Sequence, residues 1–262
     1  MRINIFFNYC LLFAVCCFLQ GCGEPLMKYD INTDTPVVES YLQEGDNSVT
    51  VKVYSMEEYL KNDIKLSKPI SQLNPTINNN ELTETSSGEY HLDLGTDTIR
   101  EGQKFSLQFD YNGKSIEAST TVPAPVHSLT VEPQSLELSS SSYFDFSDTT
   151  HVLVSWDDPD NNYYQLYIVS PSSQNMPNFG MFNHRVMQPF KGNSYRINAG
   201  EFRVAGTHTI YVYRVNADYA EMYDFVSASD LANPVSYINN AFGIFTSMSS
   251  AKINVTVYNA SE

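Results

Sequence analysis

From about residue 36 onward, apolar side chains recur at every second position rather than at every third or fourth. Successive side chains of a β-strand point to opposite faces of a sheet, so a period of two is typical of strands that bury one face. The clearest example runs from Phe105 to Val122, where two alternating segments are joined by Asn112-Gly113. Asn and Gly accept the positive φ angles of a two-residue hairpin turn. The sequence therefore predicts a β-hairpin here within a mainly β chain.

Prolines interrupt this pattern in the segment Val122-Pro123-Ala124-Pro125-Val126. Proline has no N–H to donate within a sheet and holds the preceding residue in an extended conformation. We therefore predict a domain boundary here, with an N-terminal β-sandwich over residues 36–125. Its length and strand pattern resemble those of small prealbumin or immunoglobulin-like sandwiches. Within it, residues 74–80 are expected to form a loop.

The predicted C-terminal domain covers residues 126–262. Trp156 ends one alternating segment and Tyr164 opens the next, an arrangement that resembles a fibronectin type III sandwich in which the Trp fills the core. One helix is expected within this domain, over residues 217–232, because apolar residues there recur at the spacing of one helical face. The predicted architecture is therefore two β-sandwiches, the second with an inserted helix.

The N-terminus has the layout of a secretory signal peptide. Arg2 precedes an uncharged stretch from Tyr9 to Leu19 that is too short to cross a bilayer as a helix. The stretch ends in Leu19-Gln20-Gly21-Cys22, which resembles the lipobox at which bacterial lipoproteins are cleaved and acylated. We expect a lipoprotein signal peptide over residues 1–21, lipid including palmitate on Cys22, and a hydrophilic tether over residues 22–35.

Charge and cysteine content exclude several classes of partner and site. The chain carries 30 acidic and 15 basic residues, a formal net charge of −15, which repels phosphate backbones and excludes nucleic acid as a partner. All four cysteines lie within the first 22 residues, so the folded part has no disulfide framework and no cysteine metal site.

No catalytic motif is found in the sequence. The five histidines are dispersed, and there is neither a Gly-x-Ser-x-Gly elbow nor a glycine-rich phosphate loop. We therefore expect no catalytic residue, no cofactor and no dedicated metal site, and a protein that is not an enzyme. Asp157, Asp158 and Asp160 are weak candidates for calcium, but they lack the spacing of a calcium loop, and a turn is the favoured interpretation.

Aromatic residues supply the candidate binding positions. Most of the 18 tyrosines are expected to pack on strand faces rather than contact a sugar or peptide. The segment from Asn233 to Phe245 carries little charge and follows the predicted helix. One interpretation is an exposed docking loop in which Tyr237, Phe242 and Phe245 bind a partner. The other, favoured by the apolar character of the segment, is a buried connection that pins the helix.

Several segments, in this order, resemble the lipoproteins grouped as domain of unknown function 4249, which are found in the outer membranes of one Gram-negative phylum. The resemblance covers nearly all of the chain after Cys22. It rests on Val37-Val38-Glu39-Ser40-Tyr41-Leu42, Ser87-Gly88-Glu89-Tyr90, Thr121-Val122-Pro123-Ala124-Pro125-Val126, Pro189-Phe190-Lys191-Gly192-Asn193-Ser194-Tyr195, Asp218-Tyr219 with Tyr223, and Asn233-Pro234-Val235 with Asn239, Gly243, Ile244 and Phe245. Ala241 and Thr246 depart from the pattern, since the family often has Gly at these positions.

The resemblance implies a non-catalytic accessory of a TonB-dependent outer-membrane transporter, with no catalytic residue to assign. The expected location is the outer membrane, held by the lipid on Cys22, with exposure on the cell surface as a further expectation. Two alternatives stay open at this point. One is a structural or adhesive surface protein such as a fimbrial subunit, and the other is a glycan-binding module.

The first testable expectation concerns the lipid. Replacing Cys22 by Ser removes the thiol that would be acylated, so we expect radiolabelled palmitate to be lost from the protein and the protein to leave the membrane fraction. Labelling and fractionation of cells that produce either form measure both effects. Equally firm membrane association of the Cys22→Ser form would contradict the lipid anchor.

Overall fold

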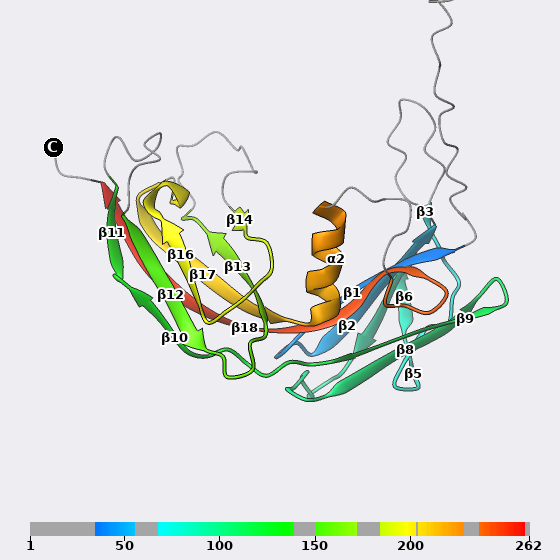
Figure 1. The fold of residues 1–262 in the computed structure, drawn as a ribbon. Coiled ribbons are helices and arrows are strands. Elements are labelled where there is room, and N and C mark those ends of the chain that lie inside the picture. The colour runs from blue at the N-terminus through cyan, green and yellow to red at the C-terminus, as the bar shows by residue number, and fades with distance from the viewer. Residues whose placement is uncertain are drawn as a thin grey trace, which may run out of the picture. The chain divides into compact units, whose positions relative to one another are not determined.

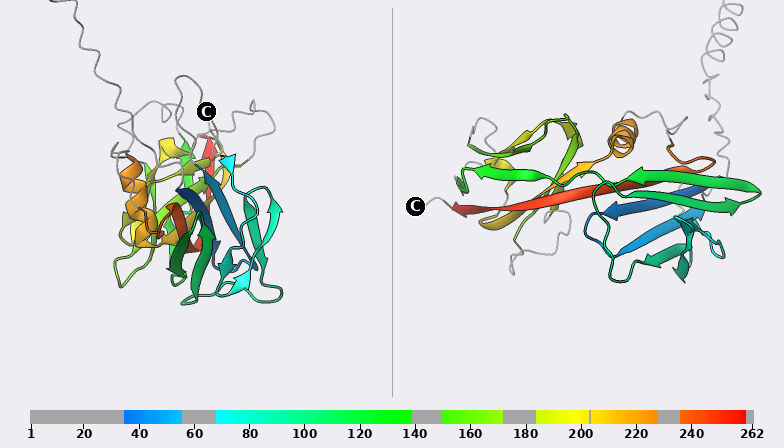
Figure 2. Two further views of the ribbon diagram at one scale, coloured as in Figure 1. Left: turned by 90° about the vertical axis from the view of Figure 1, so that its right-hand side faces the viewer. Right: turned by 90° about the horizontal axis from the view of Figure 1, so that it is seen from below.

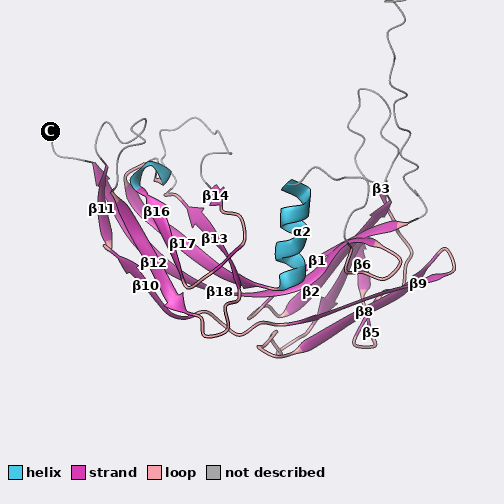
Figure 3. Ribbon diagram, viewed as in Figure 1, coloured by secondary structure: helices cyan, strands magenta, loops and turns pink. Residues whose placement is uncertain are grey.

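The computed structural model describes residues 35–55, 68–138, 150–171, 184–202, 204–227 and 236–259. Most of these residues lie in strands, which confirms the predicted mainly β class (Figures 1 and 3). Cys22 and the signal peptide lie outside the described residues. Within the described part of the chain, no helix has the length and apolar character needed to span a membrane.

The first half of the chain supplies nine strands of the described structure. They are β1 (Pro36–Gln43), β2 (Ser48–Ser55), β3 (Lys68–Pro69), β4 (Thr76–Ile77), β5 (Asn80–Glu81), β6 (Thr83–Ser86), β7 (Glu89–Asp93), β8 (Lys104–Tyr111) and β9 (Lys114–Thr121).

The second half supplies the remaining described elements. The strands are β10 (His127–Glu132), β11 (Ser135–Leu138), β12 (His151–Asp157), β13 (Tyr163–Val169), β14 (His184–Val186), β15 (Phe190–Lys191), β16 (Ser194–Asn198), β17 (Gly206–Val215) and β18 (Phe242–Asn259). The helices are the short 3-10 helix η1 (Ala199–Glu201) and α2 (Ala217–Ser227). The predicted helix is thus found over residues 217–227, and residues 228–232 lie outside the described part.

The described strands form one large sheet and two smaller ones. The large sheet has the order β14-β13-β17-β18-β1-β2-β7-β6, with β11, β15 and β3 added to β18, β13 and β2. The smaller sheets are β10-β12-β16 and β5-β4-β8-β9. Each smaller sheet shares a cluster of buried apolar side chains with part of the large sheet, which is the packing of a β-sandwich.

The first cluster lies between β1, β2 and β7 of the large sheet and the β8–β9 hairpin. Along β8 every second residue is buried, and these buried residues are Phe105, Leu107 and Phe109. The hairpin has the predicted turn, because Asn112 and Gly113 both have positive φ, 48° and 74°. The alternation read from the sequence is therefore confirmed for this unit.

The second cluster contains the residues expected to fill the C-terminal sandwich. Trp156 on β12 is 3% exposed, and its ring centroid lies 4.9 Å from that of Tyr164 on β13. Leu166 and Ile168 complete the buried side of β13. The opposite wall comes from Val152, Val154 and Ile197 of the three-stranded sheet.

β18 belongs to both halves of the large sheet (Figure 2, right). Its first part, from Phe242 to Met248, pairs in parallel with β1. Its second part, from Met248 to Val257, pairs antiparallel with β17, and its end pairs in parallel with β11. Residues 33–262 form one compact unit. Because Phe245 lies in the first cluster and Val257 in the second, the predicted division at residues 125 and 126 stays a prediction.

Buried polar side chains, here called the polar seam, lie where the segment after β9 crosses β18. Thr120 and Ser247 place their hydroxyl oxygens 2.9 Å apart, and Asn216 Nδ2 donates to both of them and to the carbonyl of Thr121. Ser249 donates to the carbonyl of Ala124 at 2.7 Å. These hydrogen bonds satisfy groups that would be costly to bury alone.

Gly243 leaves no space for a side chain between β18 and β1. It pairs with Val38 and has a φ of +96°, and a Cβ atom placed on it would lie 2.0 Å from the carbonyl oxygen of Val38. Only glycine fits this position, because any side chain would force the two strands apart.

We therefore expect Gly243→Ala to destabilise the fold by more than about 4 kcal/mol, since the clash falls on backbone atoms. Gly113→Ala is the matched control, because Gly113 also has positive φ but has no heavy atom within 4 Å of the added Cβ. The control should lose about 1–2 kcal/mol through backbone strain alone. Urea denaturation of both variants measures the difference, and similar losses would contradict the close approach.

Candidate functional site

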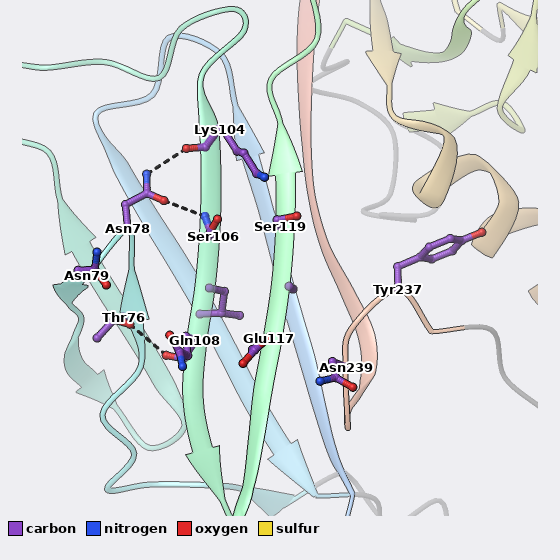
Figure 4. Close-up of a pocket in the computed structure, with 12 residues that line it drawn as sticks. Thr76, Asn78, Asn79, Lys104, Ser106, Gln108, Glu117, Ser119, Tyr237 and Asn239 are labelled. Carbon is purple, nitrogen blue, oxygen red and sulfur yellow. Dashed lines mark hydrogen bonds between the residues drawn. The ribbon is translucent and has the colours of Figure 1, made fainter.

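A polar hollow of about 640 Å³ opens beside the β8–β9 hairpin (Figure 4). It is lined by Thr76, Asn78, Asn79, Lys104, Ser106, Leu107, Gln108, Glu117, Ala118, Ser119, Tyr237 and Asn239. The lining contains one ammonium group, one carboxylate and several amides and hydroxyls. It can therefore offer many hydrogen bonds with little net charge.

The floor of the polar hollow follows from the alternation of the hairpin. Because Phe105, Leu107 and Phe109 point to the core, the residues between them point outward. Ser106 pairs with Ser119 and Gln108 with Glu117 in the register of β8 and β9. Cross-strand partners lie on the same face, so these four polar side chains form one row.

The turn between β4 and β5 forms one side of the polar hollow. Asn78 and Asn79 both have positive φ, 50° and 65°, as a two-residue turn requires. Asn78 Nδ2 donates to the carbonyl of Lys104 at 3.0 Å, and the Ser106 N–H donates to Asn78 Oδ1 at 2.9 Å (Figure 4). The loop expected over residues 74–80 is therefore right only in part, because Thr76, Ile77 and Asn80 lie in the short strands β4 and β5.

Residues 236–241 form the other side. The N–H of Asn239 donates to the carbonyl of Glu117 at 2.9 Å, and Asn240 Nδ2 donates to that of Ser115 at 2.9 Å. Ile238 is 5% exposed and Ala241 is 4% exposed, and both pack in the first cluster. This part of the segment is thus buried only in part, because Tyr237, Asn239 and Asn240 are exposed. Residues 233–235 lie outside the described part.

Tyr237 is the exposed aromatic residue of residues 236–241, with 42% of its surface accessible. Its hydroxyl donates to the Glu221 carboxylate on α2, and its ring points away from Glu117 and Asn239 (Figure 4). The hydrogen bond to Glu221, and then burial, raise the pKa of Tyr237 to about 12. Tyr237 therefore borders the polar hollow but attaches the segment to α2.

The other two predicted binding residues belong to β18. Phe245 is 2% exposed and lies in the first core cluster, so the prediction that it binds a partner is wrong. Its place is set by the parallel register of β1 and β18, which turns its side chain to the core. Phe242 is half-buried at the start of β18, opposite Val37.

Of the three weak calcium candidates, Asp157 ends β12, whereas Asp158 and Asp160 lie in the connection between β12 and β13. Asp158 Oδ2 accepts from the N–H of Asn162 at 2.8 Å, and Asp158 Oδ1 accepts from Asn162 Nδ2 at 2.7 Å. Asp157 instead accepts from the Ser128 hydroxyl at 2.5 Å. These two carboxylates have separate partners, Asn162 just before β13 and Ser128 on β10. Among the described residues, no three His, Cys, Asp or Glu side chains gather as metal ligands would.

The tyrosines of β13 and β17 divide between two faces of the large sheet. Tyr164 is 1% exposed in the second core cluster. Tyr167, Tyr211 and Tyr213 are half-buried on the opposite face, where the centroids of Tyr211 and Tyr213 lie 6.1 Å apart with 19° between their planes. Burial, and then the neighbouring Tyr211 and Tyr167, raise the pKa of Tyr213. Packing on strand faces, the favoured interpretation, fits both groups.

Sequence reasoning missed most of the lining of the polar hollow. Asn78 and Thr76 fell within the expected loop, although Asn78-Asn79 is a dipeptide that accepts the positive φ angles of a tight hairpin turn. The sequence predicts only that the outward face of the hairpin is polar, at Ser106, Gln108, Glu117 and Ser119. Their alternation predicts a polar face but does not show what lies across from it.

Comparisons with known proteins add structural similarity only. No family model matches the chain, and no curated protein matches its sequence. The crystal structure of three consecutive titin domains is similar at 8% identity and a TM-score of 0.25, over 86% of this chain and 67% of that one. The FN1–FN3 domains of chicken CNTN1 are similar at 11% identity and a TM-score of 0.27, over 85% and 64%. This chain thus spans about two thirds of each, and values this low establish neither family nor function.

The side of the polar hollow gives a testable expectation. Asn78→Ala removes two hydrogen bonds to β8 and should destabilise the protein by about 2 kcal/mol more than Asn79→Ala does. Asn79 is the matched control, because it shares the positive φ and its side chain makes no hydrogen bond in the described structure. Thermal and urea unfolding of the two variants give the comparison. Equal stability would show that the amide does not hold the turn.

Proposed function

We propose that this chain is a lipid-anchored, non-catalytic binding protein of the outer membrane that serves a TonB-dependent transporter. The lipobox-like sequence before Cys22 supports the anchor, and the resemblance to domain of unknown function 4249 supports the transporter. The polar hollow supports a binding role and is the observation that carries the proposal. Its ligand would be a polar, largely uncharged molecule or segment, such as a glycan or an extended peptide.

The shape and chemistry of the polar hollow suit recognition by hydrogen bonding. Its volume of about 640 Å³ falls within the range of small-molecule sites, and its amides and hydroxyls come from strands and from a turn held by Asn78. Side chains on strands keep their positions, so little conformational entropy is lost when a ligand binds. The row of Ser106, Gln108, Glu117 and Ser119 offers both donors and acceptors to such a ligand.

The carboxyl group of Asp218 has contacts that support a structural rather than a catalytic role. Burial raises the pKa of Asp218 at the start of α2. Its Oδ1 accepts from the Tyr219 N–H at 2.8 Å and from the Thr246 hydroxyl at 3.1 Å, so the group joins α2 to β18. Asp218 is absent from the lining of the polar hollow. A general acid or base would need to reach the bound molecule.

The adhesive alternative gains no specific support from the strand pairing. A fimbrial subunit would exchange a strand with its neighbour and leave a sheet position open. Here β1 pairs with both β18 and β2, and β18 pairs with β1, β17 and β11 within the same chain.

Chemical crosslinking in Gram-negative cells tests the proposal. Cells producing the tagged full-length protein are crosslinked and extracted with detergent, and the tag is pulled down for mass spectrometry. We expect peptides of a TonB-dependent transporter to be enriched over two controls, the Cys22→Ser form and an unrelated tagged lipoprotein. Enrichment should depend on membrane anchoring, because the lipid confines both partners to one surface. If no outer-membrane transporter is enriched, the accessory role is wrong.

A further inference from the structure

The two charged side chains of the polar hollow, Lys104 and Glu117, lie at opposite ends of it (Figure 4). Gln108 is the cross-strand partner of Glu117, and Lys104 precedes Gln108 by four residues on β8. A strand rises about 3.4 Å per residue, so Lys104 and Glu117 are separated by about 14 Å along the hairpin. The polar hollow is therefore basic at one end and acidic at the other.

Both charged side chains face the same side of the hairpin. Along β8 the buried residues alternate with exposed ones, and Lys104 belongs to the exposed set together with Gln108. Glu117 on β9 is exposed as well, and cross-strand partners such as Gln108 and Glu117 share a face. A molecule that lies along this face can thus contact both charges.

Neither charge is neutralised within the described part of the chain. The Lys104 ammonium has no hydrogen bond or ion pair there, and the Glu117 carboxylate accepts only from the uncharged Ser115 hydroxyl, at 3.1 Å. Between the two ends, the row holds Ser106, Gln108 and Ser119, which donate and accept hydrogen bonds without charge. A complementary ligand is therefore negative at the Lys104 end, positive at the Glu117 end and polar between them.

We propose that the ligand of the polar hollow is an extended peptide segment that lies along β8 and β9, with an acidic side chain at Lys104 and a basic side chain at Glu117. This inference rests on the binding role proposed above. Residues four positions apart in an extended chain lie on the same side and about 14 Å apart, because the peptide and the strands rise equally per residue. A neutral glycan would leave both charges without a partner.

Two peptides of identical composition test the required spacing. They are Asp-Ser-Thr-Ser-Lys and Ser-Asp-Thr-Lys-Ser, both acetylated and amidated at their ends, with the opposite charges four and two residues apart. Titrations of the purified full-length protein, followed by saturation-transfer difference NMR of the peptides, give each Kd. We expect the first peptide to bind about three- to fivefold more tightly, because only it reaches both charges and an exposed ion pair contributes modestly. Equal Kd values would overturn the proposal.

Matched variants assign this preference to the two charges. Lys104→Gln and Glu117→Gln should each abolish it, because one charge alone can be met by either peptide. Lys114→Gln and Glu101→Gln are the controls, since each removes one exposed charge outside the polar hollow, and they should keep the preference.

The double variant Lys104→Glu with Glu117→Lys exchanges the two ends of the polar hollow. It should regain the preference, because the peptide can bind in the opposite direction. A preference that persists in Lys104→Gln and Glu117→Gln would overturn the proposal, and so would one that is equally lost in the two control variants.

Maltotriose, an uncharged glycan, separates this proposal from the binding role itself. Binding of maltotriose with no preference between the peptides would overturn the peptide ligand and leave the polar hollow a glycan site. Binding of no probe would overturn the peptide ligand, while the crosslinking experiment would still test the transporter role. A peptide preference without any crosslinked transporter would support the ligand and contradict only that role.

Discussion

The parallel pairing of β1 with β18 is the contact on which the rest of the structure depends. It joins the two ends of the described chain and places the first half of β18 in the same sheet as β1 and β2. The second half of β18 then pairs with β17 in the other half of the sheet. One continuous backbone thus crosses both core clusters, and the absence of a side chain at Gly243 permits the approach. The polar hollow is bordered by Tyr237 and Asn239, which lie just before this strand.

The polar seam shows how polar groups are accommodated beside that strand. Ser247 and Thr246 are fully buried, positions at which an apolar residue would be the usual choice. Their hydroxyls join the end of β9, the residue before α2 and the first turn of α2 through Thr120, Asn216 and Asp218. Directional hydrogen bonds of this kind fix the position of α2 relative to the segment that follows β9. Apolar contacts alone would fix this position less well.

Local features of the fold could be predicted from the sequence, and distant pairings could not. The hairpin around Asn112-Gly113 and the buried Trp156 follow from period and turn chemistry alone. The pairing of β1 with β18 joins segments at opposite ends of the chain, and two-residue periodicity is the same for every possible partner strand. For this reason Phe245 was assigned to a binding surface instead of the core. Of the candidate site, only Tyr237 was predicted, because the polar hollow exists only where separate segments meet.

The net charge of the protein affects charged and uncharged ligands differently. The −15 charge of the chain repels any anion at long range, and it repels a polyanion most. At physiological ionic strength that repulsion is screened over about 8 Å, so it acts on a charged molecule mainly close to the protein surface. We therefore expect a nucleic acid to be disfavoured as a partner, because many of its phosphates would have to approach this acidic surface. The same acidic surface has little effect on an uncharged molecule, which agrees with the largely uncharged ligand proposed for the polar hollow.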